Sequence, residues 1–310
     1  MISHQYGAKS LTTFRPPSIP RWRAITVGCT TTVLVGRHPK VAAAVVGSKE
    51  LNNVAVLADL LLAIGDGSVE IVDLTAPLSE ATPVIQLPPP FVNTPGFSLE
   101  ELSRYDEKGP AWYWNAIHAG EHVGTHLDAP IHWVTAKDGL DVAQIPLRHL
   151  VAPAVVMDMT AEVSADPDFL LDVEHIQAWQ ERHGELPDGG WLLYRTGWDE
   201  RSADQQAFLN ADETGPHTPG VSVECARWLA EDTPIIGLGV ETVGTDAGAA
   251  HSFDPAFPCH TLLLGAGKYG LTQLQNLARL PATGSIVMAS PLPIEGGSGS
   301  PTRVLAMVPR

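Results

Sequence analysis

Residues 122 to 132 read HVGTHLDAPIH and hold three histidines and one aspartate within eleven positions. His122, His126 and Asp128 offer two imidazoles and one carboxylate, a ligand set that suits Zn²⁺, Mn²⁺ or Fe²⁺. The chain has 12 histidines, and an isolated pair is usually an ordinary surface or core feature. Three within one short segment, joined by Asp, Gly and Pro, are rarer and indicate a metal site.

The spacing of these residues limits the backbone that could bring them together. In one straight strand, His122 and His126 would lie about 13 Å apart, too far to share an ion. On a continuous helix, Asp128 would lie about 200° around the axis from His126. Gly124 and Pro130 also oppose a helix, whereas Gly124 allows a sharp bend. We therefore expect a folded loop that directs the three ligands to one point.

His132 lies four residues beyond Asp128, with a proline between them. An imidazole titrates near neutral pH, which suits proton transfer to and from a metal-activated water. The alternative is that His132 is a fourth ligand, but a catalytic metal needs an open position for water. The segment is not a zincin helix, because HExxH places glutamate after the first histidine and here Glu121 precedes it. We therefore favour His132 as a general acid/base.

The remaining pattern predicts an α/β fold. Helices are expected over 53–67, 173–184, 222–232 and 270–280, and strands over 69–75, 152–160, 189–198, 234–242, 284–290 and 303–309. The proline-rich segment 77–110 is expected to form a long loop with one short helix over 98–105. These elements predict a single mixed α/β domain over 53–310. Residues 1–52 are expected to be a leader that is disordered or does not belong to the native protein.

Composition restricts partners and location. The chain has 35 acidic and 19 basic residues, and a formal charge of −16 repels nucleic acids and anionic membranes. No apolar run reaches the roughly 18 to 20 residues of a membrane span. Cys29, Cys225 and Cys259 form neither a disulfide framework nor a cysteine metal site, which favours the cytoplasm. Export is the alternative, because TVGCTTTVLVG loosely resembles a signal-peptide core.

Two other motifs carry less information. GAGKYG matches GxGxxG, but no acidic residue follows before Glu295, so we do not expect a dinucleotide site. GGSGSP is expected to be a turn between two strands.

Aromatic residues flank the histidine-rich segment. Trp112, Tyr113 and Trp114 precede it and Trp133 follows it. Planar walls of this kind suit a flat bicyclic substrate, with Trp114 as a candidate contact. A local hydrophobic cluster explains the same residues equally well.

The segment 122–132 follows the pattern HxGTHxDxPxH and resembles the metal-dependent cyclase-like hydrolase family. Similarity extends from about Val69 to the C-terminus, through GPAWYWN, VETVGTDAG, FPCHTLLLGAGKYGL and GGSGSP, and is greatest to the isatin hydrolase branch. The resemblance implies a swivelling β/β/α fold, a homodimer or larger assembly, and metal-dependent opening of a cyclic amide, isatin to isatinate. The alternatives are an arylformamidase or lactone hydrolase using the same site, or a non-catalytic metal-binding protein.

The resemblance implies the same roles for His122, His126, Asp128 and His132 that residue type suggests. In two-metal formamidases, a later histidine and a glutamate twelve residues beyond it hold a second ion. His260 matches that histidine, but Thr272 stands at the glutamate position, with Gln273 beside it. This departure implies one divalent ion per subunit, Mn²⁺ in preference to Zn²⁺. His260 and Gln273 then become candidates for contacting the substrate or supporting a ligand.

Overall fold

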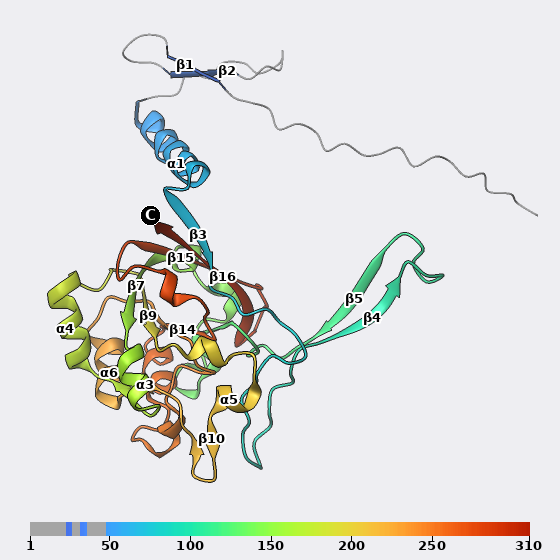
Figure 1. The fold of residues 1–310 in the computed structure, drawn as a ribbon, viewed down its shortest axis with the longest axis vertical. Coiled ribbons are helices and arrows are strands. Elements are labelled where there is room, and N and C mark those ends of the chain that lie inside the picture. Colours follow the sequence, from blue (N-terminus) through green and yellow to red (C-terminus); the bar gives the residue numbers. More distant parts are fainter. Residues whose placement is uncertain (1–22, 27–31, 36–47) are drawn as a thin grey trace, which may run out of the picture. The chain divides into compact units, whose positions relative to one another are not determined.

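The computed structural model describes residues 23–26, 32–35 and 48–310 (Figure 1). The chain divides into two compact units, Met1–Asp59 and Leu60–Arg310. In the first unit, β1 (Arg23–Thr26) pairs antiparallel with β2 (Thr32–Val35). Helix α1 (Ser48–Asp66) ends, as expected, before Gly67, which has a positive φ of 82°. Most of the proposed leader lies outside the described residues, so its boundary at residue 52 stays a prediction.

Seven strands of the second unit form a closed ring in the order β15-β7-β9-β13-β14-β6-β16, which the β15–β16 pairing completes. An eighth strand, β3, pairs with β16 beyond the part that pairs with β6. Their bounds are β3 Val69–Asp73, β6 His126–Asp128, β7 Val151–Asp158, β9 Trp191–Arg195, β13 Gly237–Val240, β14 Tyr269–Thr272, β15 Ser285–Pro291 and β16 Gly299–Pro309. Strands β7, β9, β13 and β14 are parallel, and the other pairings are antiparallel.

Alternate residues of the ring strands enter two different hydrophobic cores. Val156 and Leu193 belong to the core shared with β6, β14 and β16, whereas Val155 and Leu192 pack against helices. This alternation follows from the two-residue period of a strand. The helical layer consists of α4 (Val173–His183), α6 (Val223–Glu231) and a π-helix (Cys259–Leu264), as Figure 1 shows in part. The two layers confirm the predicted mixed α/β fold.

Local capping explains where the longer helices begin and end. The Ser222 hydroxyl accepts a hydrogen bond from the Cys225 amide at 3.1 Å, and Gly184 follows the last residue of α4. Shorter elements are α2 Leu147–Leu150, α3 Thr160–Ala165, α5 Gln205–Leu209, β8 Leu170–Leu171, β10 Ala211–Asp212, β11 Gly215–Pro216 and β12 Gly220–Val221. The 3₁₀ turns are Pro130–His132, Val134–Ala136, Val142–Gln144, Trp198–Arg201, Gly248–Ser252 and Leu277–Arg279. None of the helices in the described residues is long and apolar enough to cross a bilayer.

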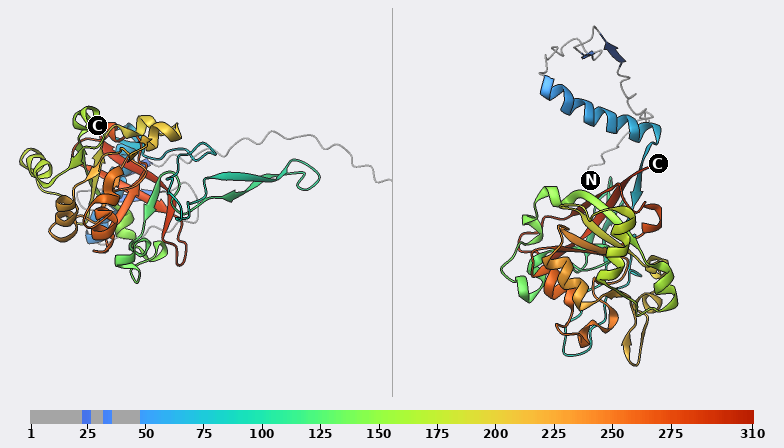
Figure 2. Two further views of the ribbon diagram at one scale, coloured as in Figure 1. Left: turned by 90° about the horizontal axis from the view of Figure 1, so that it is seen from below. Right: turned by 90° about the vertical axis from the view of Figure 1, so that its left-hand side faces the viewer.

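The helix predicted over 98–105 was wrong. This segment is β4 (Ser98–Arg104), which pairs antiparallel with β5 (Tyr113–His118) in a hairpin that projects from the rest of its unit (Figure 2). Its leucines and glutamates favour a helix in isolation, but pairing with β5 satisfies the backbone instead.

The helix predicted over 270–280 was also wrong. Strand β14 occupies the first part, buried between β13 and β6, and a 3₁₀ turn occupies the end. Gln273 and Asn276 adopt left-handed φ values of 53° and 60°, which a helix cannot accommodate. The apolar spacing that suggested a helix arises from a strand and a turn in succession.

Candidate metal centre

The histidine-rich segment changes direction twice. Gly124 has φ 61° and turns the chain into β6, which lies between β14 and β16. A 3₁₀ turn over Pro130–His132 follows. The bend at Gly124 is as expected, but the expectation of a loop throughout was wrong, because His126 and Asp128 lie two residues apart on one short strand. They therefore share a face of the sheet.

Three side-chain atoms converge at this face. His122 Nδ1 lies 2.8 Å from Asp128 Oδ1, and His126 Nε2 lies 3.4 Å from the same oxygen. His126 Nδ1 donates to the Gly124 carbonyl oxygen at 2.7 Å, which leaves Nε2 as the nitrogen with a free lone pair. Two nitrogens and one carboxylate oxygen at these separations fit the donor set of a divalent transition metal.

The Asp128 carboxyl is 2% exposed. Burial alone would raise its pKa, but His126 and His122 outweigh that effect and hold the pKa well below the ordinary value. The group is therefore a carboxylate at neutral pH, the form that binds a metal.

A chain of hydrogen bonds orients His122 from behind. Its Nε2 lies 2.9 Å from Ser298 Oγ, and that hydroxyl donates to Glu121 Oε2 at 2.5 Å. Because the hydroxyl proton points to Glu121, His122 Nε2 is the donor to Ser298, and Nδ1 is left for a metal. Gly299 allows this close approach, since a Cβ there would lie 2.6 Å from His122 Cε1.

Thr272, the residue at the position of a second metal's glutamate, contacts His126 instead. Its hydroxyl lies 2.9 Å from His126 Nδ1 and 3.1 Å from Nε2, and Thr272 is completely buried. The neighbouring Gly270 lies against Asp128, because a Cβ at Gly270 would be 2.8 Å from Asp128 Oδ2. Strand β14 therefore supports two of the candidate ligands.

His132 stacks on His122 with ring centroids 3.9 Å apart and an interplanar angle of 28°. Neither of its nitrogens has a hydrogen-bond partner in the described part of the chain. Burial lowers its pKa to about 4, against an opposing effect of Asp128, so the ring is neutral at pH 7. Atoms of His132, His122 and Asp128 also lie within 4.8 Å of one another, so His132 is close enough for the alternative role of a ligand.

His260 is next to this group. Its ring centroid lies 5.5 Å from that of His132 and 4.7 Å from that of Trp133. His260 Nδ1 donates to Asp246 Oδ2 at 2.5 Å. The tentative placement of His260 near the site is therefore consistent with the geometry.

Two other sequence candidates make no hydrogen bond with these side chains in the described residues. Gln273 is buried, and its Nε2 donates to the Pro83 carbonyl oxygen at 3.3 Å. Trp114 lies on β5 of the hairpin, where it is 56% exposed and packs edge-on against Trp112. The Oε1 of Gln273 is buried and has no hydrogen-bond partner in the described residues, so Gln273 and Trp114 stay predictions.

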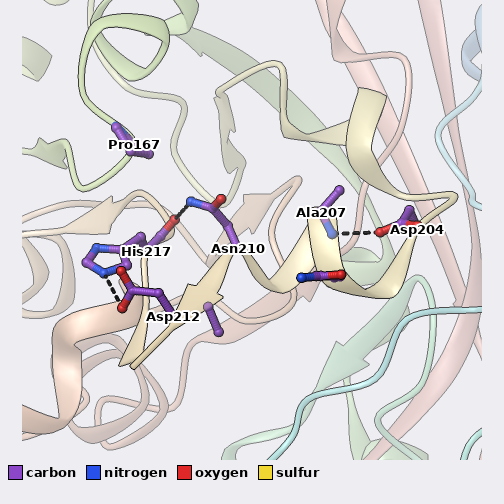
Figure 3. A pocket seen from close by; sticks show the side chains of 8 residues that line it. Pro167, Asp204, Ala207, Asn210, Asp212 and His217 are labelled. Carbon is purple, nitrogen blue, oxygen red and sulfur yellow. Dashed lines mark hydrogen bonds and ion pairs between the residues drawn. The ribbon is translucent and has the colours of Figure 1, made fainter. Parts of the chain in front are cut away.

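A separate hollow of about 570 Å³ is shown in Figure 3. Its lining contains no residue of the histidine-rich segment and consists of Pro167, Asp204, Gln206, Ala207, Asn210, Ala211, Asp212 and His217. His217 Nδ1 lies 2.6 Å from Asp168 Oδ2, which raises the pKa of His217. Its Nε2 lies 2.9 Å from Thr214 Oγ1. The polar groups here satisfy one another and suggest a structural role.

The closed strand ring, the outer helices and the convergent histidines and aspartate define a class of protein. The Cyclase family model matches residues 72–247, more than half of the chain, and the protein belongs to this family. A solved structure described as a potential metal-dependent hydrolase with cyclase activity has a TM-score of 0.56 and 25% identity, covering 78% of this chain and 99% of that one.

Particular relatives are much more similar. An isatin hydrolase from Roseibium aggregatum is 48% identical over 247 residues, which cover 79% of this chain and 94% of the relative. The structure of isatin hydrolase A from Ralstonia solanacearum has a TM-score of 0.79 and 49% identity, covering 82% of this chain and 97% of that one. An isatin hydrolase bound to the product analogue thioisatinate has a TM-score of 0.81 and 45% identity, covering 86% and 100%.

Sequence reasoning missed three residues of the site. Glu121 and Ser298 form the hydrogen-bond chain behind His122, and Asp246 holds His260. Glu121 was considered only as evidence against a zincin and Ser298 only as part of a turn, whereas Asp246 was a possible pocket residue that, alone, could not be told from a loop residue. Their long separation from their partners in sequence gave no signal.

Proposed function

We propose that the protein hydrolyses a cyclic amide, isatin to isatinate, at a centre of one divalent metal ion. The observation that carries the proposal is the convergence of His122 Nδ1, His126 Nε2 and Asp128 Oδ1 on one point beside the unpartnered imidazole of His132. The similarity to isatin hydrolases over almost their full length supports the choice of substrate.

In this proposal, His122, His126 and Asp128 hold the ion, Mn²⁺ in preference to Zn²⁺. The ion supplies Lewis-acid polarisation of the amide carbonyl and lowers the pKa of water. Thr272 lies against His126 and offers no carboxylate for a second ion, which favours one ion per subunit.

His132 acts as the general base in this scheme. Its neutral ring has no hydrogen-bond partner in the described residues, so the nitrogen without a proton is available to take one from the attacking water. If His132 were a fourth ligand, fewer positions on the ion would remain for water and substrate. If His132 is a base and not a ligand, removal of its imidazole should stop turnover and leave metal binding unchanged.

The test pairs metal analysis with a substrate panel on the full-length protein. We expect about one Mn²⁺ or Zn²⁺ per chain, loss of isatin absorbance on addition of enzyme, and no turnover by His132→Ala at unchanged metal content. Turnover of formylkynurenine or a lactone, but not isatin, would replace the proposed substrate. A metal-loaded protein that turns over none of them would be a binding protein, and failure to bind metal would overturn all of these readings.

We also propose a homodimer. The β4–β5 hairpin exposes Leu99, Trp112, Trp114 and Ile117, which are 45% to 69% exposed in the single chain. Exposed apolar surface on a projecting hairpin is typical of an interface. Light scattering of the purified protein should give twice the chain mass.

We retain the cytoplasm as the proposed location. The thiols of Cys225 and Cys259 are free and buried, which agrees with a reducing compartment, whereas Cys29 lies outside the described residues. Cell fractionation with an antibody to the protein would test this location.

A further inference from the structure

Asp246 and His260 form a buried pair next to the candidate metal centre. Asp246 lies in the loop after β13, and His260 is the second residue of the π-helix Cys259–Leu264. The Asp246 carboxylate accepts three hydrogen bonds, from the Cys259 amide at 2.7 Å, the His260 amide at 3.2 Å and His260 Nδ1 at 2.5 Å. The side chains of Asp246 and His260 are 5% and 14% exposed. One carboxylate therefore fixes both the start of the helix and the imidazole.

The hydrogen bond to Asp246 determines which nitrogen of His260 is available. Nδ1 carries the proton that is donated to Asp246, so Nε2 is the nitrogen left for another partner. No side chain or backbone group of the described residues makes a hydrogen bond with Nε2. The ring lies beside His132 and Trp133, at centroid distances of 5.5 Å and 4.7 Å. His260 is thus held in place by a group that takes no part in metal binding.

We propose that Asp246 is a positioning residue that holds His260 so that its Nε2 delivers a proton to the leaving nitrogen of the substrate. The inference rests on the proposed function and gives the two imidazoles different tasks. The water oxygen bonds to the amide carbon and one water proton passes to His132. The carbon–nitrogen bond breaks, and the nitrogen becomes an amine by taking the Nε2 proton of a His260 imidazolium, which is left as the neutral ring with its proton on Nδ1. Exchange with solvent returns both rings to their initial states, and ionisation of the new carboxylic acid releases one proton.

The electrostatic environment favours the protonated form of His260. Burial would lower the pKa of His260, but its hydrogen bond and charge interaction with Asp246 raise the pKa above the ordinary value. The carboxylate that orients the ring therefore also stabilises the imidazolium that donates the proton.

The competing explanation is that Asp246 only caps the π-helix. Two variants separate these roles. His260→Gln keeps the Asp246 bonds to both backbone amides and removes the imidazole. Asp246→Asn keeps an oxygen that can accept from the Cys259 amide and removes the charge that holds His260 Nδ1–H. If Asp246 only caps the helix and its contact with the imidazole has no part in catalysis, His260→Gln should retain full turnover.

If the proposal is correct, kcat for isatin falls about 100-fold or more in His260→Gln, the usual range for loss of a proton-transfer group. Asp246→Asn loses about tenfold or more, and the double variant is no slower than His260→Gln because both changes remove one function. KM and metal content stay within about twofold of the wild-type values. Retention of kcat by His260→Gln, or losses that multiply in the double variant, would overturn the proposal.

A second measurement does not depend on the substrate. Nitrogen-15 NMR of the imidazoles should show that the neutral form of His260 in the wild-type protein carries its proton on Nδ1, and that the His260 pKa is lower in Asp246→Asn. If the wild-type protein does not open isatin, the proposed function fails, but this spectrum still tests the pair. Identical His260 signals in the two proteins would show that Asp246 does not position the ring.

Discussion

His122 lies 2.8 Å from the Asp128 carboxylate through Nδ1, while its opposite ring nitrogen is held from behind by Ser298 at 2.9 Å. Ser298 in turn donates to Glu121. The ring is therefore held from behind by Ser298, and its tautomer follows from the direction of this hydrogen-bond chain.

We predict that Ser298→Ala weakens metal binding about 10- to 100-fold, because His122 loses the partner that fixes its tautomer and orientation. Isothermal titration of the metal-free protein with Mn²⁺ or Zn²⁺ would measure the change. Ser290→Ala, at an exposed serine on β15, is the matched control and should bind metal normally. Equal affinities for Ser298→Ala and the control would show that the hydrogen bond is dispensable.

We predict that Gly270→Ala also impairs metal binding, through Asp128. The added methyl group would lie 2.8 Å from Asp128 Oδ2 and 3.1 Å from Thr245 Cγ2, so the carboxylate must move. We expect at least tenfold weaker metal binding and a loss of about 1 to 3 kcal/mol in unfolding free energy from overpacking. Gly96→Ala places its methyl group in open space and serves as the control. Metal affinity unaffected by Gly270→Ala would mean that Asp128 is not a ligand.

The buried carboxyl of Glu241 should make the stability of the protein depend on pH. Glu241 is 1% exposed, and its Oε2 accepts from the amides of Thr196, Gly197 and Trp198 and from the Thr196 hydroxyl. Burial, followed by the charge of Asp199, raises the pKa of Glu241 from 4.5 to about 7 despite these donors. The folded protein therefore binds more protons at this group than the unfolded chain between pH 4.5 and 7.

Unfolding free energy should consequently fall as pH rises through this range, by up to about 3 kcal/mol from Glu241, and level off above pH 7. Glu241→Gln cannot ionise and should lose this part of the pH dependence, although the substitution itself costs stability. Urea unfolding of both proteins at several pH values measures the difference. Parallel pH profiles for the two proteins would disprove the prediction.

Much of the fold was predictable because hydrophobic period and capping act locally. The strands at 152–160 and 303–309 and the helix begun by Ser222 follow directly from these signals. The segment 98–105 could not be predicted in the same way, because its leucines and glutamates favour a helix until a second strand is available for pairing. The helix predicted over 270–280 was wrong because two residues with left-handed φ values, Gln273 and Asn276, interrupt an apparently helical pattern.

The candidate site was likewise predictable only where its residues are close together in the sequence. His122, His126, Asp128 and His132 lie within eleven residues, and their types alone suggested a metal centre. The groups that orient them come from distant parts of the chain, since Ser298 is 176 residues from His122 and Thr272 is 146 residues from His126. Single-sequence patterns contain no information on such pairings.

The position of β16 has a consequence for the order of folding. This last strand pairs with β6, with β3 and with β15, so it completes both the ring and one side of the strand that carries His126 and Asp128. The other neighbour of the ligand-bearing strand, β14, is also far away in the sequence. Ring closure and completion of the metal site therefore depend on the same long-range pairings, so we expect the site to form late in folding rather than within an isolated segment.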